Sequence, residues 1–385
     1  MRYRQFGKLD WRVSALGFGC MRFPTRGGNE HIDEAQATRM LHYAIEHGVN
    51  YLDTAYPYHG GNSEPFLGRF LQQDGYRDRV RLATKMPSWD IEEAGDFDRY
   101  LNEQLERLRT DHIDFYLLHA LKEEWWRKLY RLGVLEWSER AQADGRIGAL
   151  GFSFHDEFPV FREIVDAYDW VLCQIQYNYM DIDNQAGTAG LEHAAAKGIA
   201  VVIMEPLLGG RLVAPPEAIR QIWSKAPLER KPVDWALQWL WDKPEVAVVL
   251  SGMSAMSQVV ENVASANASA IGTLREDELA IVGEVRERYR SLCPIPCTQC
   301  GYCMPCPHGV DIPQNLAIYN QGPMYDKPDQ ARQSYGFLAK DKRASACVAC
   351  RECEEQCPQS IPISEWMVHA EEVLGQGAPY ICSLP

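Results

Sequence analysis

Eight cysteines in the last quarter of this 385-residue chain are the residues best suited to metal chemistry. They form two C-x2-C-x2-C runs, each closed by a Cys-Pro pair. This spacing is typical of proteins that bind two iron–sulfur clusters, in which the fourth cysteine of each run ligates the other run's cluster. The runs therefore predict two 4Fe-4S clusters, one held by Cys297, Cys300, Cys303 and Cys357 and the other by Cys347, Cys350, Cys353 and Cys306.

Zinc and disulfides are the alternatives for these cysteines. Zinc sites usually need only paired C-x2-C units, whereas each run here adds a third ligand and the Cys-Pro, so iron–sulfur is favoured over zinc and over disulfides. One departure is that only Met304 and Pro305 precede the first Cys-Pro, where the second run has three residues. Isolated cysteines are most often small buried hydrophobes, and no ligand role is expected for Cys20, Cys173, Cys293 and Cys382.

Four polar side chains at or near the ends of consecutive predicted strands suit a different chemistry: Asp53, Tyr58, Lys85 and His119. Singly, each has an ordinary structural explanation. Together they suit proton donation coupled to hydride transfer, because a phenol with a pKa of about 10 becomes a useful acid only when a nearby ammonium stabilises its anion. We expect Lys85 to act on Tyr58, Asp53 to orient Lys85, and His119 to polarise a substrate carbonyl.

The elements that must position these side chains follow from the hydrophobic pattern. From residue 15 to about 285, short β-rich runs alternate with amphipathic helical segments, which is typical of repeated βα units. Eight units predict a (β/α)8 TIM barrel, whose active site lies at the carboxyl ends of its strands. A doubly wound sheet is the alternative, but it does not require eight units. The predicted strands are 15–19, 51–55, 80–86, 113–120, 149–154, 172–177, 200–205 and 246–252.

The chain ends and its last quarter differ from this pattern. Residues 1–12 are expected to form a hairpin that plugs the barrel floor, and residues 276–290 a closing helix. After Leu292 the sequence becomes rich in Cys, Pro and polar residues. We therefore expect a barrel domain over 1–288 and a small, mainly helical di-cluster ferredoxin-like domain over 289–385, with helices near 313–320, 329–338 and 364–374.

Composition limits the partners. A net charge of −14 disfavours nucleic acid, which is bound through clustered Lys and Arg. No apolar stretch approaches the roughly 20 residues needed to span a bilayer. Thiolates that ligate iron suit a reducing compartment, so we expect a cytoplasmic protein acting on a small-molecule substrate.

The chain resembles the aldo-keto reductase superfamily through Asp53-Thr-Ala-Tyr-Pro-Tyr58, Ala-Thr-Lys85-Met and Asp114-Phe-Tyr-Leu-Leu-His119. More narrowly, Tyr58-His-Gly-Gly-Asn-Ser-Glu64, Gly151-Phe-Ser-Phe-His155 and the first cysteine run are similar to the branch with a C-terminal ferredoxin-type 4Fe-4S domain. The resemblance implies an NAD(P)H-linked reductase that interconverts carbonyl and alcohol, with Tyr58 as general acid/base and the other three residues in support.

The same resemblance implies a set of dinucleotide contacts. Two family features are missing, because Phe154 stands where an Asn is common and Met204 where an aromatic residue often stacks on the nicotinamide. Gly252 and Gln258 occupy positions that are often basic, which leaves NADPH versus NADH open. The implied contacts are Gly19, Cys20, Met21, Ser153, Gln174, Met204, Pro206, Leu207, Gly252, Ser254, Gln258, Glu261 and Asn262.

Nicotinamide exchanges hydride whereas clusters exchange single electrons, and flavin is the usual converter between the two. Three hypotheses remain open. In the first, the clusters relay electrons between a carbonyl-reducing site and a ferredoxin- or flavodoxin-like carrier. In the second, they drive reduction of a non-carbonyl substrate, with or without flavin. In the third, they are structural or redox-sensing. Trp89, Trp125 and Trp126 are expected either to line an aromatic pocket or to pack helices.

Overall fold

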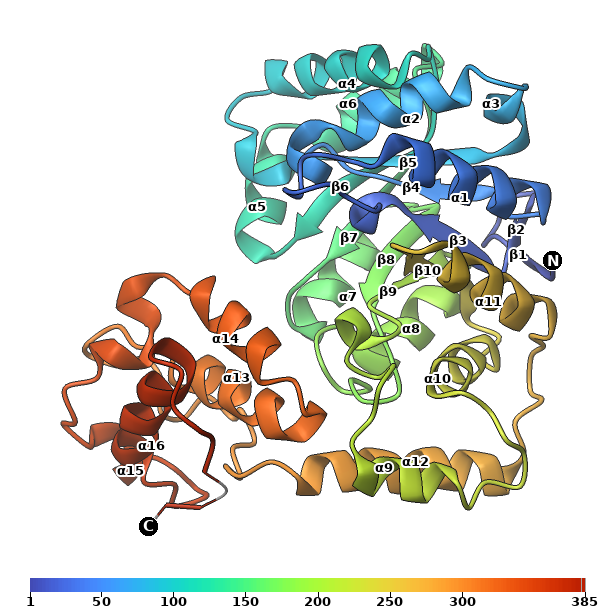
Figure 1. Cartoon of the computed structure of the whole chain (residues 1–385). Coiled ribbons are helices and arrows are strands. Elements are labelled where there is room, and N and C mark those ends of the chain that lie inside the picture. The colour runs from blue at the N-terminus through green and yellow to red at the C-terminus, as the bar shows by residue number, and fades with distance from the viewer. Residues whose placement is uncertain (382, 385) are drawn as a thin grey trace. The chain divides into compact units, whose positions relative to one another are not determined.

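A computed structural model describes residues 1–381 and 383–384; Cys382 lies outside the described residues. Eight parallel strands close into a barrel, in the order β10-β3-β4-β5-β6-β7-β8-β9 (Figure 1). The predicted (β/α)8 barrel is confirmed, and the doubly wound alternative is excluded. The strands are β3 (Leu16–Gly19), β4 (Tyr51–Asp53), β5 (Arg81–Met86), β6 (Ile113–Leu121), β7 (Ile147–Phe154), β8 (Leu172–Gln176), β9 (Ala200–Met204) and β10 (Val246–Gly252).

Helices cover the outside of the barrel because their apolar residues recur at helical spacing. In α4 (Gly95–Leu108), for example, Phe97, Leu101, Leu105 and Leu108 are buried on one face. The strands beneath are apolar on both faces, as parallel strands covered by helices must be. The other barrel-side helices are α1 (Glu34–Glu46), α2 (Ser63–Leu71), α3 (Tyr76–Arg79), α5 (Glu123–Arg131), α6 (Val134–Ala143), α7 (Phe158–Ala167), α8 (Gly187–Ala196), α10 (Pro232–Trp241) and α11 (Met256–Asn267).

An N-terminal hairpin fills the floor of the barrel. Strands β1 (Tyr3–Gln5) and β2 (Arg12–Ser14) pair antiparallel. Phe6, which follows β1, is fully buried, and its ring lies 4.9 Å from Phe115 and 5.9 Å from Tyr51. The expected plug is therefore present, and it leaves the opposite end of the barrel as the mouth.

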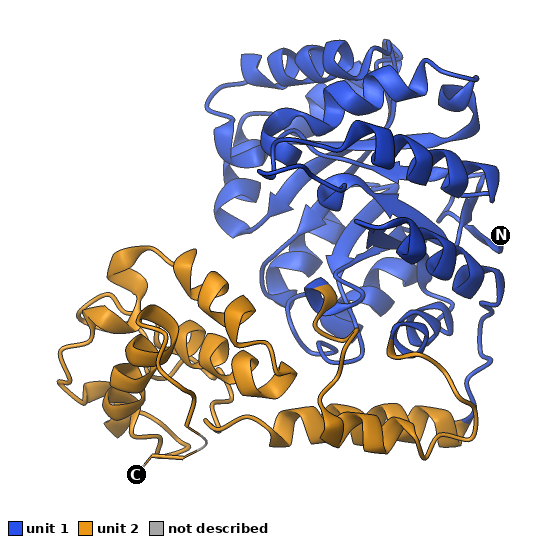
Figure 2. Ribbon diagram, viewed as in Figure 1, with its two compact units in different colours: residues 1–209, 233–275 blue, residues 210–232, 276–385 orange. Residues whose placement is uncertain are grey.

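The chain forms two compact units (Figure 2). The first comprises residues 1–209 and 233–275, and the second residues 210–232 and 276–385. The helix expected over 276–290 is α12 (Glu276–Ser291), and it belongs to the second unit together with α9 (Glu217–Trp223). Lys225, just after α9, forms an ion pair with Glu284 of α12 at 3.0 Å. The domain boundary expected near residue 289 stays a prediction.

The rest of the second unit is mainly helical, as expected. Its core includes Leu316, Tyr319, Trp366 and Met367, with Tyr319 and Trp366 edge to face at 5.3 Å. Three cysteines of each run pack against this core: Cys297, Cys303, Cys306, Cys347, Cys353 and Cys357. None of the described helices is both long and apolar enough to cross a membrane. The helices are α13 (Ile312–Tyr325), α14 (Pro328–Gly336), α15 (Glu352–Glu355) and α16 (Ile363–Ala370).

Candidate active site and cluster cavities

The barrel brings the four predicted catalytic residues to its mouth. Asp53 is the last residue of β4, Lys85 lies near the end of β5, and His119 lies near the end of β6. These strands are consecutive neighbours in the parallel sheet, so their carboxyl ends meet at one edge. Tyr58 opens the short turn η2 (Tyr58–Gly61) that follows β4.

Lys85 is the centre of the group. Its Nζ donates to Asp53 Oδ1 at 2.6 Å, to the Thr54 carbonyl at 2.7 Å and to the Tyr58 hydroxyl at 3.4 Å. The side chains of Lys85 and Asp53 are 1% and 3% exposed. All three ammonium protons are engaged, so the charge is held in a fixed position between a carboxylate and a phenol.

The electrostatics favour a protonated phenol beside a charged ammonium. Burial lowers the pKa of Lys85, but the Asp53 carboxylate and the Tyr58 oxygen outweigh it, and the pKa is raised. Burial raises the pKa of Tyr58, and the Lys85 charge opposes that rise. Burial likewise raises the pKa of Asp53, and the Lys85 charge opposes that rise. Near neutral pH, Tyr58 therefore carries a proton and Lys85 carries a charge.

His119 completes the group as a neutral ring. Burial, then the charges of Lys85 and His155, hold its pKa well below the usual range. Its Nδ1 is buried and has no hydrogen-bond partner among the described residues. The ring lies 6.0 Å from that of Tyr58 and nearly perpendicular to it. A neutral imidazole in this place is suited to hydrogen-bond a substrate oxygen without adding charge.

Two supporting residues were missed from the sequence. Gln104 of α4 is fully buried and donates to the Lys85 carbonyl at 3.1 Å and to Glu64 Oε1 at 2.5 Å. It also accepts a hydrogen bond from the Tyr116 hydroxyl at 2.7 Å. The sequence did contain a signal for Gln104. It is a polar residue on the apolar face of a predicted helix, and such a residue must find hydrogen-bond partners when it is buried.

The second is His59, which fixes the turn that carries Tyr58. His59 is 2% exposed and has a positive φ of 55°. Its Nδ1 donates to the Asn29 carbonyl at 2.6 Å, and the Phe23 amide donates to its Nε2 at 3.2 Å. Both ring nitrogens therefore tie η2 to the loop after β3.

Several of the expected dinucleotide contacts lie on strands that border the four residues. In the sheet, Gly19 pairs with Asp53 on one side and with Gly252 on the other. Ser153 is buried and accepts a hydrogen bond from the Ala120 amide at 2.7 Å. Gln174 is also buried, and its Oε1 has no partner among the described residues. An orphaned acceptor of this kind fits a carboxamide donor, so the residues present are compatible with a nicotinamide.

The remaining expected dinucleotide contacts differ in their hydrogen bonds, packing and exposure. Gln258 Oε1 accepts from the Ser254 amide at 2.8 Å at the start of α11, and Asn262 donates to Ser251 Oγ at 3.0 Å. Phe154 is fully buried and packs edge to face on Phe161 at 5.1 Å. The others divide by exposure: Met21, Gly252, Ser254 and Glu261 are exposed, Met204 and Leu207 are half-buried, and Cys20 and Pro206 are buried.

The tryptophans separate into two groups. Trp89 lies 5.0 Å from the His119 ring and 5.8 Å from Trp125. Trp126 of α5 instead packs on Trp170 and on Tyr130 of the same helix. The aromatic surface beside His119 is thus formed by Trp89 and Trp125, whereas Trp126 packs helices.

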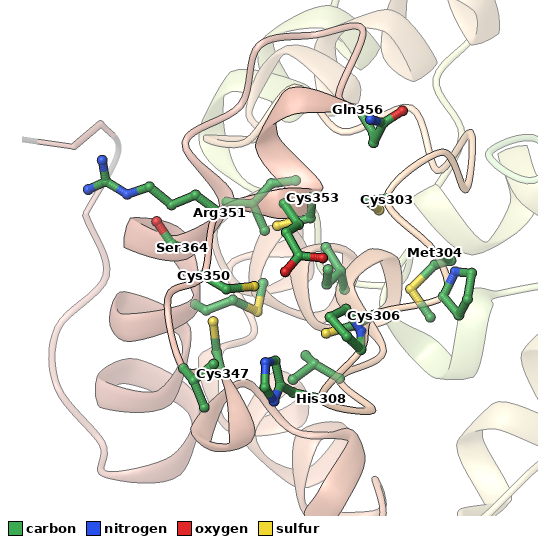
Figure 3. A pocket seen from close by; sticks show the side chains of 18 of the residues that line it. Cys303, Met304, Cys306, His308, Cys347, Cys350, Arg351, Cys353, Gln356 and Ser364 are labelled. Atoms are coloured by element: carbon green, nitrogen blue, oxygen red, sulfur yellow. The ribbon is translucent and has the colours of Figure 1, made fainter.

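Two cavities in the second unit each collect one predicted ligand set. The smaller one is lined by Cys297, Cys300, Cys303 and Cys357. The larger, of about 430 Å³, is lined by Cys306, Cys347, Cys350 and Cys353, with Cys303 also in its wall. Figure 3 shows Cys306 of the first run across this cavity from Cys347 and Cys350 of the second. The smaller cavity therefore includes Cys357 from the second run, and the larger includes Cys303 and Cys306 from the first.

The local backbone supports this fit. Gln299 and Ala349, at equivalent places in the two runs, both have a φ of 56°. Their amides donate to Cys297 Sγ at 3.4 Å and to Cys347 Sγ at 3.5 Å. None of the eleven described cysteines forms a disulfide, so all eight run cysteines are available as ligands. The residues present fit two multi-iron clusters with crossed ligands.

Comparisons with known proteins agree with both parts of this description. The Aldo/keto reductase family model matches residues 15–287, and a 4Fe-4S dicluster domain model matches residues 296–361. The uncharacterized oxidoreductase YqkF of Bacillus subtilis is 30% identical over 72% of this chain and 94% of its own. L-galactose dehydrogenase of Arabidopsis thaliana is 26% identical over 75% and 95%.

A solved structure is similar as well. Aldo-keto reductase AKR11C1 from Bacillus halodurans, in its holo form, is 27% identical with a TM-score of 0.63, over 74% of this chain and 96% of that one. The resemblance inferred from the sequence is confirmed. The chain belongs to the aldo/keto reductase family and is an oxidoreductase that carries a 4Fe-4S dicluster domain after its barrel.

Proposed function

We propose that this oxidoreductase interconverts carbonyls and alcohols with NAD(P)H, and that Tyr58 is its general acid/base. The observation that carries the proposal is the buried Lys85 ammonium, held between Asp53 at 2.6 Å and the Tyr58 hydroxyl at 3.4 Å. A lysine in this place has no structural need for a phenol beside it, but a phenol that must release a proton needs the lysine.

The roles follow from the charges. When bound, the reduced nicotinamide supplies a hydride to the carbonyl carbon. Tyr58 gives its hydroxyl proton to the carbonyl oxygen, which becomes the alcohol, and the resulting phenolate is stabilised by the Lys85 ammonium. Asp53 keeps Lys85 charged and oriented. His119, neutral and with an orphaned ring nitrogen, hydrogen-bonds the same oxygen.

The nicotinamide is proposed to lie across the ends of β7 and β8. Gln174 offers a buried acceptor with no partner among the described residues, and the Ser153 hydroxyl lies on the neighbouring strand. Both suit a carboxamide group. Gly19, Cys20 and Met21 would line the ribose on the opposite side, and the segment from Gly252 to Asn262 would hold the adenosine.

The clusters are proposed to relay single electrons to or from a ferredoxin- or flavodoxin-like carrier in the cytoplasm. Each cluster would exchange one electron at a time with such a carrier. The chain's own contribution is the two crossed cysteine sets, each lining a separate cavity.

The experiment is anaerobic purification of the full chain with iron, sulfide and flavin analysis, followed by NADPH and NADH oxidation with a panel of aldehydes and ketones. Two clusters without flavin, together with carbonyl-dependent oxidation of a nicotinamide, are the expected result. Tightly bound flavin with no nicotinamide oxidation would overturn the proposal in favour of a cluster-driven or flavin-driven reductase of another substrate.

A further inference from the structure

Strand β6 contains a β-bulge at His119. Leu118 and Leu121 of β6 lie opposite Phe152 and Phe154 of β7, and the register shifts between these two pairs. Two residues of β6 therefore stand where β7 has one, and the first of the two is His119. Bulges bend a strand and re-aim a side chain, and they are common next to active sites.

The bulge decides which side chains face the barrel mouth. Cross-strand partners share one face of a sheet, so Leu121 lies on the face of Phe154, which packs on Phe161 of α7. That face is the helix-covered outside of the barrel, and Leu121 is fully buried. In a regular strand, side chains two residues apart share a face, and Leu121 would point the same way as His119. The extra residue thus keeps a leucine out of the mouth.

The second bulge residue, Ala120, has a strained backbone that one side chain holds. Its φ is 53°, in the left-handed region that residues other than glycine rarely adopt. Its amide donates to Ser153 Oγ at 2.7 Å. Beyond the bulge, the His155 amide donates to the Leu121 carbonyl at 3.0 Å, so the ladder resumes. The Ser153 hydroxyl therefore provides the acceptor for the bulged amide.

We infer that Ser153 is a positioning residue for His119, because its hydroxyl holds the bulge that directs the histidine toward the substrate oxygen. The inference rests on the proposed nicotinamide-dependent function, and it goes beyond the carboxamide contact expected of Ser153. The two roles are compatible, since a hydroxyl has two acceptor positions and one donor proton. Accepting from Ala120 leaves that proton for the carboxamide. One side chain thus connects the nicotinamide with the histidine.

The variant Ala120→Gly separates the two roles of Ser153. Glycine enters the left-handed region without steric cost, so a bulge with glycine at its second position should not need the serine hydroxyl. The proteins compared are the wild type, Ser153→Ala, Ala120→Gly and the double variant, all with full chains and loaded clusters. The measurements are kcat for carbonyl reduction at saturating nucleotide, the affinity for NADPH and NADH, and the unfolding temperature.

Ser153→Ala should lower kcat by about tenfold or more, because a small misplacement of a catalytic group slows the reaction strongly. It should also weaken nucleotide binding. Adding Ala120→Gly should restore kcat but not the affinity, and it should raise the unfolding temperature of Ser153→Ala more than that of the wild type. The inference is overturned if kcat stays at the wild-type value in Ser153→Ala, if it stays low in the double variant, or if the two rises in unfolding temperature are equal.

Ser138→Ala is the matched control. Ser138 is fully buried, and its hydroxyl donates to the Leu135 carbonyl at 2.7 Å within α6. Its loss should leave kcat and affinity unchanged; a loss equal to that of Ser153→Ala would make burial the cause and overturn the inference. If Ser153→Ala does not fold, Ala120→Gly must restore folding, and failure to do so also overturns it. If the wild type oxidises neither nucleotide, the proposed function fails, whereas the unfolding temperatures still test the bulge.

Discussion

At the scale of single residues, the account depends on one buried ion pair. Breaking a buried pair typically costs about 3–5 kcal/mol, because the remaining charge stays unpaired. Lys85 and Asp53 hold that pair within hydrogen-bond distance, and the phenol of Tyr58 shares the lysine. In the proposed reaction, the acidity of Tyr58 is therefore set by Lys85.

This arrangement predicts a pH profile. Because burial raises the pKa of Tyr58, the phenol stays protonated at neutral pH, so kcat for carbonyl reduction should be flat there and fall as pH rises through that raised pKa. Lys85→Met removes the charge that opposes the rise. The alkaline fall should then move to higher pH, with kcat lower by about a hundredfold or more.

The measurement is kcat against pH for both proteins, with circular dichroism to show that the variant is folded. An alkaline fall that moves to lower pH in Lys85→Met would contradict the assigned role of the lysine.

At the scale of elements, the fourth cysteine of each run lines the cavity that holds most of the other run's cysteines. Cys357 lies in the wall of the cavity that also contains Cys297 and Cys300, although it is contributed by the second run. Cys306 lies in the other cavity, with Cys347 and Cys350. Each cluster site therefore needs both runs to be folded.

Paired cysteine variants should reveal this crossing. Cys300→Ser and Cys357→Ser are expected to remove the same cluster, so their double variant keeps one cluster. Cys300→Ser combined with Cys306→Ser should remove both clusters. Iron content and the electron paramagnetic resonance of the reduced protein count the clusters. Loss of both clusters in the Cys300/Cys357 double variant, with one kept in Cys300/Cys306, would show uncrossed ligands instead.

The elements also show what the sequence predicts and what it does not. Strand ends and helix periodicity are local patterns, so they predicted the barrel and the placing of Lys85 beside Asp53. The settings of Gln104 and His59 depend on residues tens of positions away, because Gln104 donates to Glu64 and His59 donates to the Asn29 carbonyl. No local pattern indicates these contacts, since they exist only once the barrel has folded.

At the scale of the whole molecule, the chain leaves the barrel unit after β9 and returns at the start of α10. Residues 210–232 belong to the second unit, where Ile219, Ile222 and Trp223 of α9 are buried and Arg230 pairs with the buried Glu278 of α12. Residues 210–232 thus lie within the barrel sequence but pack against α12, which follows residue 275. A chain cut after its last strand-helix unit would therefore lack the packing partners of this segment.

Two truncations should separate this dependence from the clusters. A chain that ends after Ser291 keeps α12 and should remain soluble and folded. A chain that ends after Arg275 exposes the apolar face of α9, which loses about 1.5–3 kcal/mol for each large side chain uncovered, and it should unfold at a lower temperature or aggregate. Thermal unfolding and size-exclusion chromatography compare the two. Equal stability would contradict the packing of residues 210–232 on α12.

The central claim is that Tyr58 supplies the proton in a nicotinamide-linked reduction. The most direct test is Tyr58→Phe in the cluster-loaded protein, measured as single-turnover oxidation of bound NADPH or NADH with a carbonyl substrate that the wild type reduces. The account predicts that the rate falls by at least about a hundredfold, while nucleotide affinity and cluster content stay at wild-type values. Wild-type turnover by Tyr58→Phe, with the nucleotide bound, would contradict it.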